Sequence, residues 1–269
     1  VEHMFVNEFT LRDADVDIVS RGDPATYYVI DASADEMATN DQILHVPVSG
    51  LRPGCEIEFR MTRQDLADPE EFPFDEYPLA LSYPIARKLL YIKVPPESFT
   101  FRSSNAGESV ENDGGRYWLM NAVPFYRYEP YQPLGVEYLP TVWLGSPTAT
   151  WSEVVTDYQE RIEERLEPEE EVATLAASLT TEAKDDTDKV LALVDYVQQH
   201  VTYRAIEFGV RGQMPQNAAK TIRDRHGDCK DHSLLLHQLL KAQGIESYLA
   251  LVRSDGPIER EIPSGDQFD

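Results

Sequence analysis

The sequence lacks any apolar run close to the roughly 18–20 residues that a membrane-spanning helix needs, so we expect no transmembrane segment within it. It is also poor in positive charge. Its 24 Lys and Arg residues face 48 Asp and Glu residues, which gives a formal net charge of −24. Such an acidic surface repels phosphate backbones, and no basic patch with interleaved aromatic residues offsets it. We therefore predict no nucleic-acid partner.

Cysteine is equally scarce, since only Cys55 and Cys229 occur. Two distant cysteines do not form the disulfide framework of a small secreted domain. Cys55 follows Arg52-Pro53-Gly54 at a predicted turn-to-strand junction, where we expect it to pack as a small hydrophobe. Cys229 lies in a different context and is the candidate for chemistry.

The remaining composition is that of a globular protein, with 42% hydrophobic and 10% aromatic residues. A length of 269 residues suffices for two modest domains, and no internal repeat is visible. We predict an α+β protein with an antiparallel β-sandwich domain over residues 1–147 and a cysteine-containing domain over residues 148–269.

The first of these domains is predicted from short β-branched or aromatic runs separated by Gly, Pro, Asn and Asp. The runs are Tyr27–Ile30, Gln42–Val46, Glu56–Met61 and Leu89–Val94. Asp113-Gly114 before Arg116–Met120 is typical of a hairpin. We expect the Pro-rich passage 124–147 to be an extended strap that leaves this domain.

Helical spacing of apolar residues begins after Thr150. It predicts helices over residues 151–166, from about residue 187, over residues 218–225, and from Asp228 to a C-terminal Gly244. The acidic run 167–171 is expected to be a solvated linker or a helix start. Residues 247–252 are expected to form a strand buried on both faces.

Cys229 is predicted to occupy the first position of the helix that Asp228 caps, with Asp231 completing a capping box. The partial positive charge of a helix N-terminus favours the thiolate over the thiol, although an ionised Asp228 beside it acts in the opposite direction. A backbone amide of the same turn can stabilise an oxyanion during acyl transfer. We expect Gly227 to allow a sharp turn and open access to the sulfur.

The run His226-Gly227-Asp228-Cys229-Lys230-Asp231, followed by a Leu-rich helix and Gly244-Ile245, resembles the bacterial transglutaminase-like superfamily. Further points of similarity flank this run on both sides. They are Tyr203, Ile206-Glu207, Gly212, Pro215 and Ala218 before it, and Ile262–Phe268 after it. The N-terminal half, with Leu51–Phe59, Phe72-Pro73 and Trp151–Val154, is similar to the β-rich domain of unknown function that often precedes this core.

This resemblance implies a papain-like fold, with Cys229 as the nucleophile of an acyl-transfer reaction on peptide or Gln amides. Water as acceptor gives a peptidase or deamidase, and an amine gives crosslinking. No metal and no organic cofactor are implied, and the partner is a protein or peptide substrate.

The family's base is a His just after the Pro-Ser-x-x-x-Phe segment, followed by an orienting Asp or Asn. The sequence ends at Asp269 before either position, so we expect a truncated core that is inactive as given. The resemblance favours the bacterial periplasm or cell envelope.

Other interpretations of the same residues stay open. His226 and His232 lie three residues from Cys229, and His237 lies one turn further, but neighbours on one helix rarely have the geometry of a catalytic base. His3, His45 and His200 are weaker candidates. The group His226, Cys229, His232 and His237 could hold zinc, although its spacing is unusual for zinc sites. In a non-enzymatic alternative, the β domain binds a protein or glycan and the thiol core is vestigial.

Overall fold

The computed structural model describes most of the chain. Its described residues are 3–15, 17–34, 37–64, 72–93, 97–112, 114–123, 125–127, 129–205, 213–254 and 256–268. The predictions that involve Asp113, Ile206, Glu207 and Gly212 lie outside this part. The chain divides into two compact units, Val1–Leu66 with Ala205–Arg211, and Ala67–Arg204 with Gly212–Asp269.

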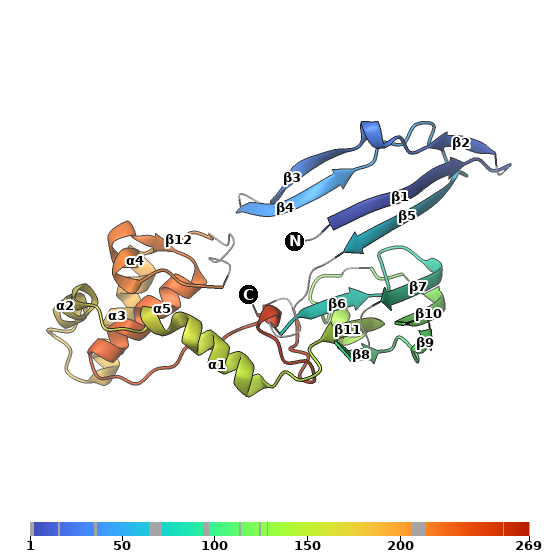
Figure 1. The fold of residues 1–269 in the computed structure, drawn as a ribbon. Helices are drawn as coiled ribbons and strands as arrows, with labels where there is room; N and C mark the ends of the chain where they lie inside the picture. Colours follow the sequence, from blue (N-terminus) through green and yellow to red (C-terminus); the bar gives the residue numbers. More distant parts are fainter. Residues whose placement is uncertain are drawn as a thin grey trace. The chain divides into compact units, whose positions relative to one another are not determined.

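The first unit is built from antiparallel strands (Figure 1). These are β1 (His3–Arg12), β2 (Ile18–Arg21), β3 (Tyr28–Ala34), β4 (Met37–His45) and β5 (Glu56–Gln64). One sheet has the order β2-β1-β5, and β3 pairs with β4. Leu11 and Phe9 are buried, and the Phe9 ring meets Phe59 edge to face at 6.1 Å. Cys55 ends a turn in which Gly54 has a φ of +91°, directly before β5, as the sequence predicts.

Six strands of the second unit form two antiparallel sheets, β6-β11-β8 and β7-β10-β9. They are β6 (Phe74–Pro78), β7 (Ile85–Lys93), β8 (Thr100–Ser104), β9 (Val110–Asn112), β10 (Gly115–Val123) and β11 (Thr141–Gly145). The two sheets share one core, in which Trp118 of β10 packs with Val142 of β11 and with Phe101 of β8. β9 and β10 pair in antiparallel orientation.

The prediction of an extended strap over residues 124–147 is wrong for part of this passage. Thr141–Gly145 is the central strand of the β6-β11-β8 sheet, and all five of its residues are buried. The prolines explain the error, because Pro140 and Pro147 bracket the strand without interrupting it. Between them, Val142 and Trp143 have the β-branched and aromatic side chains that favour a strand.

Helices follow where the periodicity changes after Thr150 (Figure 1). They are α1 (Trp151–Ile162), α2 (Glu170–Leu179), α3 (Asp186–His200), α4 (Ala218–Asp224) and α5 (Cys229–Ala242). Thr150 caps α1 in a capping box with Glu153. Of the two interpretations of the acidic run, the helix start is confirmed, because Glu170 and Glu171 open α2. Acidic side chains favour the first turn of a helix because of its dipole.

The core of the helical part forms around α5. Leu234, Leu235 and Leu239 of α5 are fully buried. Leu235 and Leu239 lie on the side of the helix that packs against α2, α3 and α4, with Val172, Ala176, Leu193 and Ala218 as neighbours in the same cluster. Gly244 follows the helix with a φ of +73°, a conformation that costs glycine little, so the predicted C-terminal end is confirmed.

The predicted buried strand over residues 247–252 is wrong. These residues have no regular secondary structure, and Tyr248 and Val252 are exposed. A strand buried on both faces needs a neighbouring strand to satisfy its backbone groups, and within the described residues none pairs here. A short apolar run therefore did not suffice to define a strand.

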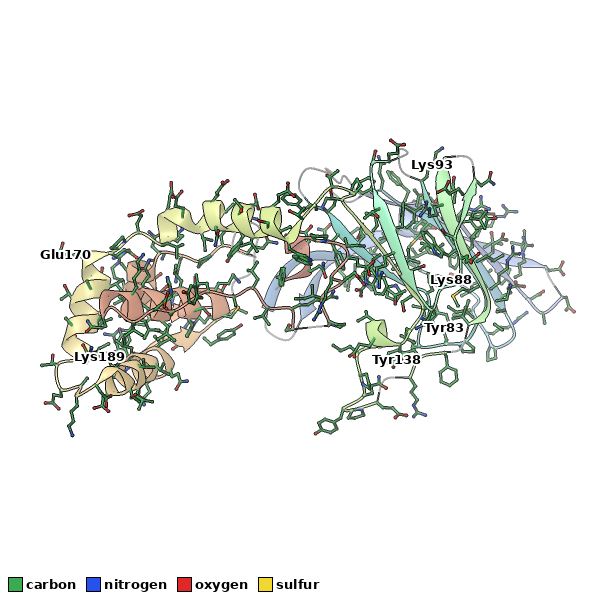
Figure 2. The ribbon with its side chains drawn as sticks, turned by 90° about the horizontal axis from the view of Figure 1, so that it is seen from below. Tyr83, Lys88, Lys93, Tyr138, Glu170 and Lys189 are labelled. Atoms are coloured by element: carbon green, nitrogen blue, oxygen red, sulfur yellow. The ribbon has the colours of Figure 1, made fainter. Side chains whose placement is uncertain are left out.

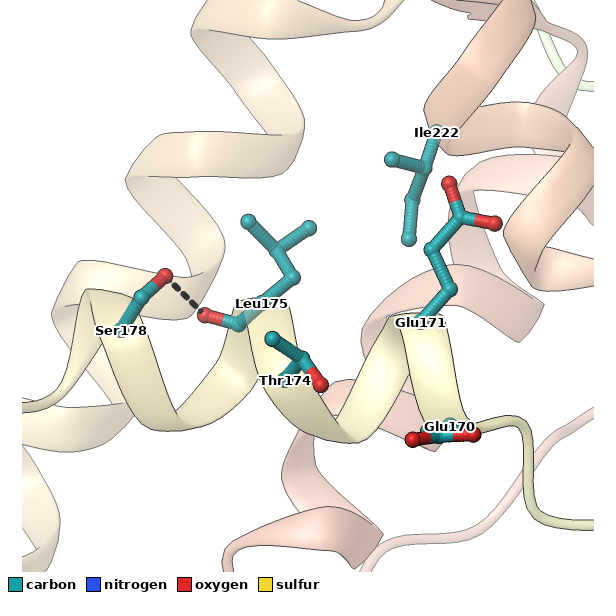
Figure 3. Close-up of a pocket in the computed structure, with 6 residues that line it drawn as sticks. All are labelled: Glu170, Glu171, Thr174, Leu175, Ser178 and Ile222. Atoms are coloured by element: carbon teal, nitrogen blue, oxygen red, sulfur yellow. Dashed lines mark hydrogen bonds between the residues drawn. The ribbon is translucent and has the colours of Figure 1, made fainter.

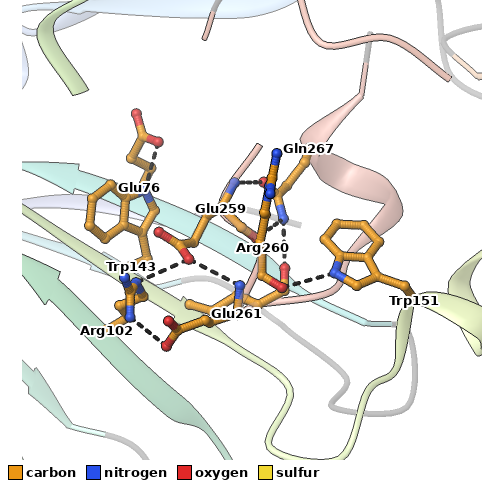
Figure 4. A network of polar contacts seen from close by, with 9 residues as sticks. Glu76, Arg102, Trp143, Trp151, Glu259, Arg260, Glu261 and Gln267 are labelled. Atoms are coloured by element: carbon orange, nitrogen blue, oxygen red, sulfur yellow. Dashed lines mark hydrogen bonds and ion pairs between the residues drawn. The ribbon is translucent and has the colours of Figure 1, made fainter. Parts of the chain in front are cut away.

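Polar contacts instead hold the C-terminal segment 253–268 to the β6-β11-β8 sheet (Figure 4). Arg102 of β8 forms ion pairs with Glu259, at 3.0 Å, and with Glu261. The Gln267 side chain donates to the Glu259 and Ile262 carbonyl oxygens. The Trp151 indole donates to the Arg260 carbonyl oxygen at 2.9 Å, which connects this segment to the start of α1.

The surface of the described part is consistent with the sparse positive charge of the sequence. Lys88 and Lys93 lie on β7, and Lys189 lies on α3, where it pairs with Asp186 (Figure 2). None of the described helices is both long and apolar enough to cross a bilayer. The domain limits predicted at residues 1–147 and 148–269, and a single β-sandwich over the first of them, stay predictions.

Truncating Leu235 to Ala should lower the free energy of unfolding by about 2–5 kcal/mol, because it leaves a cavity in the shared core of four helices. Urea denaturation followed by circular dichroism at 222 nm measures this change. Leu191→Ala is the matched control, since Leu191 of α3 is 62% exposed and its truncation should change stability by only about 0.5 kcal/mol or less. Equal effects of the two variants would contradict the packing described.

Candidate active site around Cys229

Cys229 is the first residue of α5, and its side chain is exposed. Asp228 is the N-cap, and its Oδ1 accepts hydrogen bonds from the Lys230 and Asp231 amides at 3.0 and 3.2 Å. Asp231 completes the capping box, because its Oδ2 accepts from the Asp228 amide at 3.1 Å. The predicted position of Cys229 at a capped helix N-terminus is therefore confirmed. Within the described residues, the Cys229 amide has no hydrogen-bond acceptor and points to no carbonyl of its own helix.

Both carboxylates of the capping box are fully buried. Burial of an ionised carboxylate is costly unless hydrogen bonds and an opposite charge compensate it. The first-turn amides supply hydrogen bonds to Asp228, and Lys230 supplies a charge, with its Nζ 3.1 Å from Asp228 Oδ2. The Lys230 side chain is only 9% exposed, so the ion pair is largely shielded from water.

Asp231 also binds a loop that lies far from it in the sequence. Its Oδ1 accepts from the Gln216 amide at 2.8 Å. The Gln216 side chain in turn donates to Thr221 Oγ1 and to the His226 carbonyl oxygen. This loop, α4 and the start of α5 are therefore held together by one hydrogen-bond network. Sequence reasoning identified the capping role of Asp231 but missed Gln216, because no spacing signals this contact.

Gly227 is needed for close approach rather than for a special backbone angle. A Cβ atom at this position would lie 2.5 Å from Asp231 Cβ and 2.8 Å from Asp231 Oδ2. Its φ lies outside the left-handed region, so the expected sharp turn that only glycine allows is not its role. The absent side chain makes room for the buried Asp231 carboxylate directly beside the cysteine.

A short parallel pairing fixes the chain just before Cys229. β13 (His226–Gly227) pairs with β12 (Thr202–Tyr203). His232 contacts the same region, since its Nδ1 lies 2.8 Å from the Asp228 carbonyl oxygen and its Nε2 lies 3.1 Å from the Val201 carbonyl oxygen. Both ring nitrogens of His232 therefore face backbone carbonyls, which gives this imidazole a structural position.

Tyr158 of α1 is a neighbour of Cys229 that sequence reasoning missed. Its hydroxyl donates to the Gln213 carbonyl oxygen at 3.3 Å, and Arg161 donates to the Gln213 side chain at 3.0 Å. Burial raises the pKa of Tyr158 above its usual value of 10.0; the Arg161 charge lowers this pKa by a smaller amount, and the Cys229 charge raises it by a still smaller amount. The sequence showed Tyr158 only as one member of the apolar stripe of a helix.

The other candidate histidines make contacts of their own. His226 Nδ1 lies 2.9 Å from the Asp224 carbonyl oxygen, and His237 Nδ1 lies 2.9 Å from Ser247 Oγ. His200 stacks on Tyr196, and His45, in the first unit, stacks on Tyr28. Nothing is described for the His3 side chain. In the described part of the chain, no hydrogen bond joins a histidine to Cys229, and no three His, Cys, Asp or Glu side chains are grouped as metal ligands.

A shallow depression on α2 is separate from this site (Figure 3). It is lined by Glu170, Glu171, Thr174, Leu175, Ser178 and Ile222. Glu171 forms an ion pair with Arg223 at 2.6 Å, and the Ser178 hydroxyl donates to the Leu175 carbonyl oxygen. Its carboxylates thus lie on an open helix surface.

Comparison with known proteins identifies the helical part. Residues 173–265 match the family model of the transglutaminase-like superfamily, and the match includes most of α2, all of α3 to α5, and Cys229. The chain therefore contains a transglutaminase-like domain, as the motif around Cys229 predicts. The identity of the N-terminal β-rich region stays a prediction. No curated protein is significantly similar to the chain.

A solved structure supports the same fold. A protein from Parabacteroides distasonis, described as "a putative protease", superposes with a TM-score of 0.63 at 20% identity, over 90% of this chain and 49% of its own. The chain thus spans about half the length of that protein. A "putative cysteine protease" from Cytophaga hutchinsonii, with 15% identity over 62% of each chain, has a TM-score of 0.25, which is too low to support an argument. The predicted α+β fold, with an antiparallel strand-rich region before a transglutaminase-like core, is confirmed.

Replacing Gly227 by Ala should lower the free energy of unfolding by about 1–3 kcal/mol, because the new methyl group overlaps Asp231 and strains the capping box. Urea denaturation measures the change. Gly265→Ala is the control, since a Cβ there would meet only Val154 Cγ1, at 4.0 Å. A Gly227→Ala protein as stable as the control would show that the carboxylate has room to move.

Stability should also depend on the protonation of His237. Burial, and secondarily Lys241, lowers the pKa of His237 below its usual 6.5. The unfolded chain therefore binds this proton first as the pH falls, so stability is lost from about pH 6.5 down to the folded pKa. In His237→Gln this loss disappears. The difference between the unfolding free energies of the wild type and the variant should decrease as the pH is lowered from 7.5 to 5. A constant difference would contradict the lowered pKa of His237.

Proposed function

We propose that the protein is a cysteine acyl-transfer enzyme of the transglutaminase-like type that acts on peptide or Gln amides, with Cys229 as the nucleophile. The observation that carries this proposal is an exposed thiol at the first position of a capped helix whose own amide is available. The helix N-terminus favours the thiolate, which is the reactive form of cysteine. The match of residues 173–265 to the transglutaminase-like superfamily supports the same role.

In the proposed reaction, the Cys229 sulfur attacks the amide carbonyl carbon and forms a tetrahedral intermediate. The C–N bond then breaks, the nitrogen leaves as ammonia or an amine after it receives the proton that the thiol has lost, and a thioester stays on Cys229. Water or an amine attacks the thioester next, releases the acid or the new amide, and returns the thiol. Water as acceptor makes the protein a peptidase or deamidase, and an amine makes it a crosslinking enzyme.

The first-turn amides suit the charge that develops in this reaction. The Asp228 cap occupies the amides of Lys230 and Asp231, so the Cys229 amide is the remaining donor of the first turn beside the sulfur. A donor in this place stabilises the oxyanion of the tetrahedral intermediate. Exposure of Cys229 leaves the sulfur accessible to a peptide chain.

Iodoacetamide should alkylate Cys229 of the folded chain at pH 7 faster than it alkylates the same thiol in urea. Mass spectrometry after a short exposure measures the modified fraction at each cysteine. Cys55→Ser is the matched control and should leave the fast reaction unchanged, whereas Cys229→Ala should remove it. If the folded and unfolded chains react at equal rates, the helix does not activate the thiol.

Turnover should depend on the same thiol. In the whole protein, Cys229→Ala should reduce ammonia release from Gln peptides, or incorporation of a fluorescent amine into casein, by at least about 10³-fold. Cys55→Ser should retain full activity. An active Cys229→Ala protein would contradict the enzyme proposal, and a wild-type protein without turnover on any amide would favour a binding scaffold.

A further inference from the structure

The residue before the candidate nucleophile presents an electrostatic difficulty. Asp228 is adjacent to Cys229 in the chain and is fully buried. A negative charge next to a thiol disfavours the thiolate, and low-dielectric surroundings strengthen this effect. The cap nevertheless requires the carboxylate form of Asp228, because its Oδ1 accepts two backbone amides. The residue that orders the helix start therefore opposes the chemistry expected there.

Lys230, which follows Cys229 in the sequence, compensates the charge of Asp228. Its ammonium lies 3.1 Å from Asp228 Oδ2, the carboxylate oxygen that the amides of Lys230 and Asp231 do not use. The side chain is 9% exposed, which is unusual for lysine and requires a partner. The pair thus keeps the Asp228 carboxylate as a cap while its charge is neutralised beside the sulfur.

We propose that Lys230 is a positioning residue for the reaction of Cys229. Its ammonium cancels the charge of the buried Asp228 cap, so that the field of the α5 N-terminus favours the Cys229 thiolate. This inference rests on the proposed function, because it explains how the thiol of a cysteine acyl-transfer enzyme becomes reactive beside a carboxylate.

Among the described residues, the other charged or titratable groups near Cys229 make contacts of their own. On α5 itself, Asp231 adds a second buried negative charge, and both ring nitrogens of His232 face carbonyls. From α1, Tyr158 has a raised pKa and is neutral below pH 10, while Arg161 contacts Asp157 and Gln213. From the paired strands, His226 contacts the Asp224 carbonyl oxygen, and the Tyr203 ring packs on His232.

The test is the pH dependence of Cys229 alkylation by iodoacetamide between pH 4 and 10, measured in the Cys55→Ser chain. Lys230→Met removes the ammonium but keeps the length of the side chain, so the pH of half-maximal rate should rise by about one unit, and the rate below that pH should fall about tenfold. Asp228→Asn keeps a capping side chain and leaves Lys230 charged, so the profile should move to lower pH. The double variant should lie between the two single variants.

Two further variants control for structural effects. Lys230→Arg keeps the positive charge and should preserve the wild-type profile. Lys220→Met removes an exposed lysine that pairs with Asp224 on α4, and it should leave the profile unchanged. If Lys230→Met does not fold, the double variant is compared with Asp228→Asn, and its profile should lie about one pH unit higher because only the ammonium differs.

Opposite shifts of the two single variants support the proposal, since a loosened helix start would move both profiles in the same direction. An unchanged profile in Lys230→Met, or equal profiles of Asp228→Asn and the double variant, would overturn it.

Turnover of the whole protein distinguishes this failure from failure of the proposed function. An active enzyme that needs Cys229 but has an unchanged Lys230→Met profile overturns only the role of Lys230. Shifted profiles in a protein without turnover would overturn only the proposed enzymatic function.

Discussion

The rest of the site depends on a reciprocal pair of hydrogen bonds, in which the buried carboxylates of Asp228 and Asp231 each accept from the backbone amide of the other residue. A buried carboxylate without donors costs several kcal/mol, so the segments that supply donors are bound firmly to it. The first turn of α5 supplies amides to Asp228, and the distant Gln216 amide binds Asp231. Segments that are separate in the sequence therefore meet beside Cys229, and Gly227 is small enough to let them meet.

Helix α1 connects this hydrogen-bond network to the C-terminal segment that is bound to the β6-β11-β8 sheet. Trp151, at the start of α1, donates to the Arg260 carbonyl oxygen and contacts Phe268 edge to face. Two turns later, Tyr158 donates to the Gln213 carbonyl oxygen in the loop that leads to Gln216. One rigid helix thus contacts both the segment anchored to β8 through Arg102 and the loop anchored to Asp231.

Local chemistry made part of this structure predictable. Asp228 and Gly244 mark the ends of α5 because a cap and a left-handed residue leave strong sequence signals, and the motif around Cys229 led to the family whose model matches residues 173–265. The central strand Thr141–Gly145 was missed because flanking prolines resembled a strap, and the strand expected at 247–252 has no pairing partner among the described residues. Gln216, Tyr158 and the buried position of Lys230 depend on tertiary contacts, which no spacing in one sequence reveals.

Helix α5 serves two purposes with a single rigid body. Its buried leucines form the centre of the helical core, and its first residue carries the thiol. A helix transmits displacement along its axis, so any change of volume around Leu239 that slides α5 also moves the sulfur. Reactions of this kind tolerate misplacement of about 1 Å only at a large loss of rate. Selection for catalysis would therefore restrict which hydrophobic residues the core accepts, even three turns away from the cysteine and even where the protein would still fold.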